Sequence, residues 1–162
     1  MHYDDWKDNF STLFVNIDFP EDWTGVRWQS AWNVDMGNAA GLPTKYEAPH
    51  RQQYANNPQF LLTPQKDCEI VISLAQLGGR LPELRKDKPS GKQYYDYPFA
   101  ETLKYACLAI FQLEHGQKTL NDFDTDKIVY LSPIKREREN SGRCHLKGGR
   151  SYIAVPATET PN

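Results

Sequence analysis

The chain has 162 residues and a mass of 18.7 kDa, the size of one globular domain that can bury a core. Its 19 Lys and Arg residues against 21 Asp and Glu residues give a formal net charge of −2, which excludes a strongly basic nucleic-acid-binding domain. An aromatic content of 12% exceeds that of a typical disordered chain, whereas a mean hydropathy of −0.72 and eleven prolines predict a thin core with many polar loops.

The N-terminal region predicts a short helix followed by a strand. Residues 4–13 carry apolar side chains at helical spacing and begin with two aspartates, which the helix dipole favours in a first turn. Residues 13–19 switch to a period of two, with apolar residues on one face, and Pro20 ends this predicted strand.

Short apolar segments bounded by Gly, Pro, Asp or Asn continue along the chain, a pattern typical of a sandwich or barrel. Further strands are predicted over residues 26–32, 59–62, 68–77, 105–113, 127–134, 142–146 and 151–155. The runs 68–74 and 105–111 are apolar on both faces and are predicted to be the central strands of two packed sheets. Residues 78–103 hold three prolines and no apolar period, which predicts a long loop. The predicted fold is all-β, an antiparallel β-sandwich with a short N-terminal helix.

The three cysteines, Cys68, Cys107 and Cys144, lie far apart without a CxxC pair, which argues against a disulfide framework or a zinc site. We expect buried free thiols. Cys144 is followed by His145, but neighbours on an extended strand point to opposite faces, so these two residues do not predict a catalytic dyad. No catalytic residue is predicted.

An acidic segment repeats a carboxylate at every second position: Asp122, Asp124 and Asp126. Three hard oxygen ligands on one side of a loop suit calcium, which is therefore the candidate cofactor. An EF-hand is excluded, because its sixth and twelfth positions would be Lys127 and Pro133 instead of Gly and Glu. A calcium site of another loop type and a solvated acidic turn are both compatible with the pattern.

Two segments are locally basic. Residues 80–92 hold five bases against two acids, and residues 135–150 hold six bases against two acids. If both lie at one end of a sandwich, they form a patch for acidic phospholipid or an acidic protein surface; the alternative is two ordinary solvated loops. The first 22 residues hold six acids and one lysine, an asymmetry that favours docking between domains. The candidate lipid- or partner-binding residues are Arg80, Arg85, Lys86, Lys88, Lys92, Lys135, Arg136 and Arg138.

Four segments, in the same order along the chain, together resemble the calpain family of cysteine proteases. Residues 3–10 look like the end of the calpain protease core, and residues 38–43 are similar to the family's Ala-Gly-Gly-Cys turn. The most specific segment is Asn-Pro-Gln-Phe at 57–60, and residues 149–161 are similar to the family's Tyr-Val-Ile-Val-Pro-Ser-Thr-Phe-Glu-Pro run. Gly41 and Leu42 stand where the family's turn has Gly and Cys, and residues 48–57 lack the dense acidic loop of conventional calpains. These differences suggest an atypical calpain or calpain-like protein.

The resemblance implies that residues 1–19 are the end of the protease core with a linker and that residues 20–162 form a C2-like β-sandwich of the calpain domain III type. It also implies that this sandwich lacks its last strand and that the sequence is a fragment of a longer protein. It implies a non-catalytic regulatory domain of an intracellular cysteine protease, because no segment matches the motifs of the family's catalytic Cys, His and Asn. The expected partners are the protease core and an acidic phospholipid or protein surface, with no nucleic acid.

No apolar run reaches the roughly 20 residues of a membrane span and the N-terminus lacks a signal-peptide pattern, so a cytoplasmic location is expected, with peripheral contact to membranes or cytoskeleton. The alternative function is a scaffold module of a catalytically dead calpain-like protein. The third interpretation is that the chain is an enzyme by itself. It would require that the isolated chain has peptidase activity and that substitution of Cys144 abolishes this activity.

Overall fold

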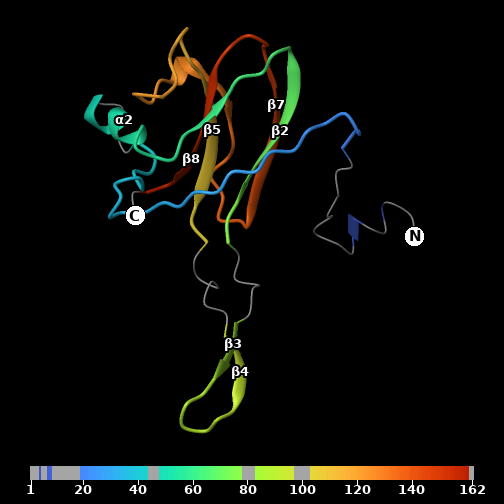
Figure 1. Cartoon of the computed structure of the whole chain (residues 1–162), viewed down its shortest axis with the longest axis vertical. Helices are drawn as coiled ribbons and strands as arrows, with labels where there is room; N and C mark the ends of the chain where they lie inside the picture. Colours follow the sequence, from blue (N-terminus) through green and yellow to red (C-terminus); the bar gives the residue numbers. More distant parts are fainter. Residues whose placement is uncertain are drawn as a thin grey trace.

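The computed structural model describes residues 4, 7–8, 19–43, 48–77, 83–96 and 103–160, and in them it places short antiparallel strands and one short α-helix with assigned bounds (Figure 1). The all-β prediction is therefore confirmed. The elements are α2 (Ala48–Tyr54), β1 (Phe60–Leu62), β2 (Cys68–Ala75), β3 (Glu83–Lys86), β4 (Gln93–Asp96), β5 (Ala106–Gln112), a 3-10 helix (Thr125–Lys127), β6 (Ile128–Leu131), β7 (Glu139–Leu146) and β8 (Tyr152–Thr158).

A four-stranded sheet with the order β1-β8-β5-β6 forms the centre of the fold. Its two inner strands, β5 and β8, pair without a break from Ala106 opposite Thr158 to Gln112 opposite Tyr152. Nearly every residue of these two strands is buried. Strands covered on both faces need apolar side chains at consecutive positions, which explains the unbroken apolar run that marked β5 in the sequence.

Each face of this sheet is covered by a different layer. On one face, Ile110 and Tyr152 pack against the two-stranded sheet of β2 and β7. On the other face, Phe111 packs with Tyr54 of α2 and with Phe123, and the centroids of these three rings lie 4.8–5.8 Å apart in edge-to-face pairs. Such aromatic pairs add to the free energy of burial. The central sheet thus forms the middle layer of the molecule (Figure 1).

The prediction that residues 68–74 form the central strand of a second packed sheet is wrong in its position, because β2 forms there but has β7 as its one partner among the described strands. Strand β2 is mostly half-buried, and β7, its antiparallel partner from Cys68 opposite Leu146 onward, alternates between exposed and less exposed positions. Only one face of this pair covers the core. Its outer face carries residues such as Glu69 and Arg143, whose side chains form an ion pair at 3.8 Å.

The predicted strand at residues 26–32 is also wrong, because residues 19–33 contain neither helix nor strand. The segment crosses the fold in an extended conformation (Figure 1) and is attached through side chains. The ring of Trp28 lies 5.7 Å from that of Phe60, and Trp32 Nε1 donates a hydrogen bond to the carbonyl of Pro156 at 3.2 Å. The two tryptophans attach this segment to β1 and β8 through their side chains, and its backbone does not pair with a strand.

The N-terminal predictions fall mostly outside the described residues. Within the predicted helix, residues 4, 7 and 8 are helical, and Lys7 forms an ion pair with Asp4 at 2.8 Å. Of the predicted strand at 13–19, only Phe19 is described, and its ring stacks on Trp23 at 5.5 Å.

The predicted loop at residues 78–103 contains an antiparallel hairpin, in which β3 and β4 pair from Glu83 opposite Asp96 to Lys86 opposite Gln93. Figure 1 shows the hairpin beyond the end of the sandwich, away from the sheets. Its residues from Leu84 to Tyr94 are exposed except for the half-buried Asp87. A strand with solvent on both faces needs no apolar alternation, so the sequence pattern did not reveal it.

None of the described helices has the length and apolar character required to span a membrane.

Candidate binding surface

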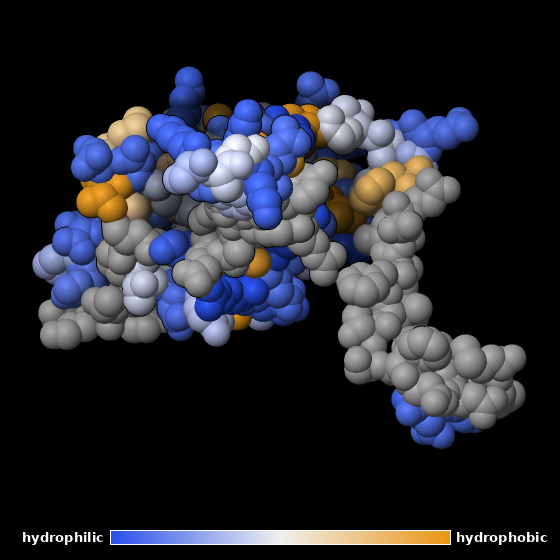
Figure 2. Space-filling view, turned by 90° about the horizontal axis from the view of Figure 1, so that it is seen from below, coloured by the Kyte–Doolittle hydropathy of each residue, from blue (hydrophilic) through white to orange (hydrophobic). Residues whose placement is uncertain are grey.

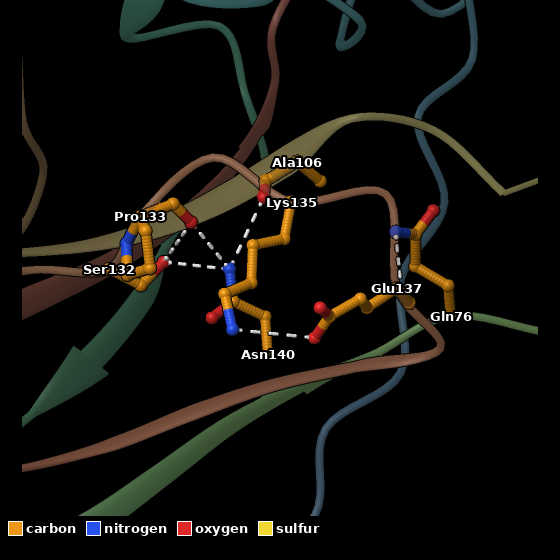
Figure 3. A network of polar contacts seen from close by, with 7 residues as sticks. All are labelled: Gln76, Ala106, Ser132, Pro133, Lys135, Glu137 and Asn140. Atoms are coloured by element: carbon orange, nitrogen blue, oxygen red, sulfur yellow. Dashed lines mark hydrogen bonds and ion pairs between the residues drawn. The ribbon is translucent and has the colours of Figure 1, made fainter. Parts of the chain in front are cut away.

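Gln76, directly after β2, connects three segments at one end of the sandwich. Its backbone N–H donates to the carbonyl of Arg138 at 2.8 Å, and its Nε2 donates to the carbonyls of Lys104 at 2.9 Å and Glu137 at 3.2 Å. Its Oε1 accepts from the backbone N–H of Lys104 at 2.9 Å. The connection between β6 and β7 therefore lies at the same end as the chain that leaves β2 and the chain that enters β5 (Figure 3).

A buried polar network holds this β6–β7 connection in place. Asn140 Nδ2 lies within hydrogen-bond distance of the carbonyls of Pro133, at 2.7 Å, and Ala106, at 3.3 Å, and of Ser132 Oγ, at 3.1 Å (Figure 3). Lys135 and Ala106 exchange both backbone hydrogen bonds, at 3.0 and 3.1 Å. Because each of these polar groups is satisfied by a partner fixed in the sheets, residues 132–137 have a defined path.

A recess of about 250 Å³ opens beside this connection. Its lining includes the cations Lys104 and Arg136 together with Thr158, Thr160 and the carboxylate residue Glu159. Arg136 Nε donates to the carbonyl of Leu103 at 3.0 Å, which uses one of the five N–H donors of the guanidinium group and fixes its plane. A positioned guanidinium beside an ammonium group suits a phosphate or carboxylate oxygen.

The β3–β4 hairpin presents the second group of bases. Its turn is stabilised by Asp87, whose backbone N–H donates to the carbonyl of Lys92 at 2.9 Å and whose carboxylate accepts from the N–H of Ser90 at 3.0 Å and from the Ser90 hydroxyl. Gly91, at φ 67°, adopts the left-handed conformation that the turn requires. The one acid at the tip is thus used inside the turn, and the exposed cations of the hairpin are Arg85, Lys86, Lys88 and Lys92.

The structure places seven of the eight predicted basic residues, and all seven are exposed. Four lie on the hairpin, and Lys135, Arg136 and Arg138 lie on the β6–β7 connection; Arg80 is outside the described residues. Seen from the end of the molecule at which the hairpin lies, the described surface is largely hydrophilic (Figure 2). One base is partly neutralised, because Lys135 Nζ lies 3.5 Å from the carboxylate of Glu137. Sequence reasoning missed Lys104, an isolated lysine outside both basic segments, which the structure brings into the recess.

Two of the three predicted calcium ligands have side chains that take part in other contacts. Asp122 forms an ion pair with Arg51 of α2 at 3.2 Å, and Asp124 caps the 3-10 helix by accepting from the N–H of Asp126 at 3.1 Å. Across the described part of the chain, no group of three or more His, Cys, Asp or Glu residues is arranged to hold a metal ion. A calcium site at these residues stays a prediction.

The thiols and the neighbouring histidine do not form a nucleophile with a base. Burial raises the pKa of Cys107 to about 11, and burial together with nearby Cys68 raises the pKa of Cys144. Cys144 packs against the core, whereas the His145 side chain is 82% exposed and lies 4.0 Å from Glu69 on the outer face of β7. Raised thiol pKa values oppose formation of the reactive thiolate at neutral pH.

The family model of the calpain large subunit, domain III, matches residues 28–162. The chain belongs to the calpain domain III family. The resemblance read from the sequence is thereby confirmed. Neither the curated proteins nor the solved structures contain a match to the chain.

Calpain domain III is a non-catalytic domain of a calpain-type protein, and the match covers the whole described sandwich from Trp28 onward. The motif that carried most of the resemblance proves to be structural. Asn57 holds the turn at Gly41, and Gln59 bonds to both the N–H and the carbonyl of Leu120, at 2.8 and 3.0 Å. In this calpain domain the sequence signature therefore marks the packing of the fold.

Proposed function

We propose that this domain regulates a calpain-type intracellular cysteine protease by docking on its protease core and by binding acidic phospholipid through its basic end. In this proposal residues 1–19 belong to the core and its linker, and residues 20–162 form the regulatory sandwich in the cytoplasm, with peripheral contact to membranes. The observation that carries the lipid-binding part is the Gln76 network, which holds Glu137 and Arg138 of the β6–β7 connection beside the end of β2, after which the chain continues to the hairpin.

The two basic segments have complementary geometry for a membrane surface. The hairpin offers long basic side chains on an exposed strand pair, with Leu84 and Tyr94 exposed beside the bases. The recess with Lys104 and Arg136 offers a positioned site for one phosphate group. Each base close to an anionic membrane contributes about 1 kcal/mol, so several bases at one end give measurable binding.

The test is co-sedimentation of the protein with vesicles that contain phosphatidylserine or phosphoinositides, with and without calcium, across a salt series. Replacement of Lys86, Lys88 and Lys92 by Gln removes three charges from the hairpin and is expected to weaken binding about hundredfold. The matched control replaces Lys66, Lys118 and Arg150, which lie toward the opposite end of the strands, by Gln and retains binding. Equal losses in both variants, or binding that salt does not weaken, would contradict the proposal.

Docking on the protease core is supported by the family assignment and by the acids at the N-terminus, of which Asp4, Asp8, Glu21 and Asp22 are described and exposed. The corresponding measurement is binding of the domain to the isolated core of its parent protein across a salt series. A parent core without catalytic Cys, His and Asn would favour the scaffold function instead.

A further inference from the structure

Thr160 lies just after β8 and lines the recess beside the β6–β7 connection. Two hydrogen bonds hold the chain at this residue. The hydroxyl of the buried Thr158 donates to the carbonyl of Thr160 at 2.7 Å, and the N–H of Glu159 donates to the carbonyl of Tyr105 at 2.7 Å. Thr160 itself is exposed. A threonine with a fixed backbone and access to solvent therefore forms part of the wall of the recess.

The two cations of the recess can accept a further anionic partner. Arg136 uses Nε for the carbonyl of Leu103, which leaves its two terminal NH₂ groups for other acceptors. In the described part of the chain, neither Arg136 nor Lys104 takes part in an ion pair. Among the described residues that line the recess, Glu159 is the one acid. A phosphate group in the recess thus meets more positive than negative charge.

The sequence after the recess residue is that of a kinase substrate. Thr160 is followed by Pro161, and a serine or threonine directly before a proline is the minimal substrate sequence of proline-directed protein kinases. The chain has two other such residues, Thr63 and Ser132. Ser132 is only 3% exposed and bonds to Asn140, whereas Thr63 is exposed but does not line the recess. Of the three, Thr160 alone combines an exposed position with the cations of the recess.

We propose that Thr160 is a phosphorylation site and that its phosphate binds to Arg136 and Lys104. In the transfer step, the threonine hydroxyl oxygen forms a bond to the γ-phosphorus of ATP, the bond from that phosphorus to the β,γ-bridging oxygen breaks, and ADP leaves. The hydroxyl proton passes to the catalytic base of the kinase. The product carries up to two negative charges, and its oxygens accept charge-assisted hydrogen bonds from both cations. A recess of about 250 Å³ has room for this group, because one water molecule in the liquid takes only about 30 Å³.

The captured phosphate regulates the basic end of the domain. It occupies the position that the proposed function assigns to the phosphate of a lipid, and it cancels positive charge at the same end. Phosphorylation therefore weakens binding to acidic vesicles. This consequence rests on the proposed function, whereas the capture of the phosphate by Arg136 and Lys104 does not.

The first experiment measures phosphate transfer and capture without lipid. The Thr63→Ala protein is treated with ATP and a proline-directed kinase, and mass spectrometry locates the phosphate. Phosphorus NMR then follows the titration of the phosphothreonine, which we expect to become dianionic at lower pH than in the urea-unfolded chain, because the cations outweigh Glu159. Arg136→Gln should raise the midpoint toward that of the unfolded chain. The control Arg138→Gln changes an exposed base of the same connection that does not line the recess, and it leaves the midpoint unchanged.

Failure of the kinase to modify Thr160 overturns the proposal. So does a titration midpoint that neither Arg136→Gln nor Lys104→Gln changes, because the phosphate then lies outside the recess.

The second experiment compares co-sedimentation of the phosphorylated and unphosphorylated proteins with phosphatidylserine vesicles. We expect affinity to fall at least about tenfold on phosphorylation. If the unphosphorylated protein binds and phosphorylation leaves its affinity unchanged, the regulatory part is overturned. If neither form binds while the titration shift is present, the lipid-binding proposal fails and the capture of the phosphate is supported.

Discussion

Asn57 and Gly41 are joined by two hydrogen bonds between a side chain and a turn of the backbone. The Asn57 carboxamide accepts from the N–H of Gly41 at 3.3 Å and donates to its carbonyl at 2.9 Å, and it also donates to the carbonyl of Tyr54 at 3.0 Å. Asn57 is only 3% exposed, and Gly41 has a positive φ of 68°. One side chain thus connects the turn at Gly41 to the end of α2, just before the start of β1.

Replacement of Asn57 by Ala is expected to lower the free energy of unfolding by about 2 kcal/mol, because it leaves the buried N–H and carbonyl of Gly41 without their side-chain partner. Urea denaturation measures the change. Asn56→Ala, at the exposed neighbouring position, is the control and is expected to stay within about 0.5 kcal/mol of the wild type. Equal stabilities of the two variants would show that water replaces the amide contacts.

Gln76→Ala is expected to loosen the basic end without unfolding the sandwich. The half-buried Gln76 side chain bonds to backbone groups of Lys104 and Glu137, so its loss frees two segments that otherwise keep their sheet hydrogen bonds. Hydrogen exchange should become faster at residues 104–106 and 135–138 and remain unchanged in β8, and vesicle binding should weaken. Gln53→Ala, on the exposed side of α2, serves as the control.

Cys107 is expected to resist alkylation in the folded protein. Burial raises its pKa to about 11, so at pH 8 the thiol is protonated as well as inaccessible. The neutral thiol favours the folded state: this contribution is complete below the ordinary thiol pKa and is lost as the pH rises through about 11. Mass spectrometry after iodoacetamide treatment should show labelling of Cys107 only when urea unfolds the chain. Rapid labelling of Cys107 in buffer would contradict the burial of β5.

Calcium is expected to leave the melting temperature unchanged. The Asp122 carboxylate is paired with Arg51 and the Asp124 carboxylate caps the 3-10 helix, so binding would have to break both interactions before it could gain ligands. The measurement is thermal unfolding with calcium and with a chelator. An increase in melting temperature that Asp126→Asn removes would establish the calcium site that the sequence spacing predicts.

The strands that the sequence predicted well are those whose side-chain pattern reflects complete or one-sided burial. Strand β5 is buried on both faces and is therefore apolar throughout, whereas β7 has one face toward the core and one toward solvent and therefore alternates. Both patterns can be read from the residues of the strand itself. The segment at 26–32 has the same local pattern but anchors through Trp28 and Trp32, and no strand lies beside it to complete a ladder. Helix α2 has only seven residues, too few to show a helical period.

The sequence by itself determined the family, the all-β class and the two basic segments, because these depend on residue types in a fixed order along the chain. Only the tertiary structure decided that Lys135, Arg136 and Arg138 lie at the end of the sandwich beyond which the hairpin lies, that Lys104 joins Arg136 at a recess and that β6 is an edge strand. Those relationships depend on which strands become neighbours. Strand pairing is set by contacts between residues far apart in the chain, such as Gln76 with Glu137, and no local pattern encodes such contacts.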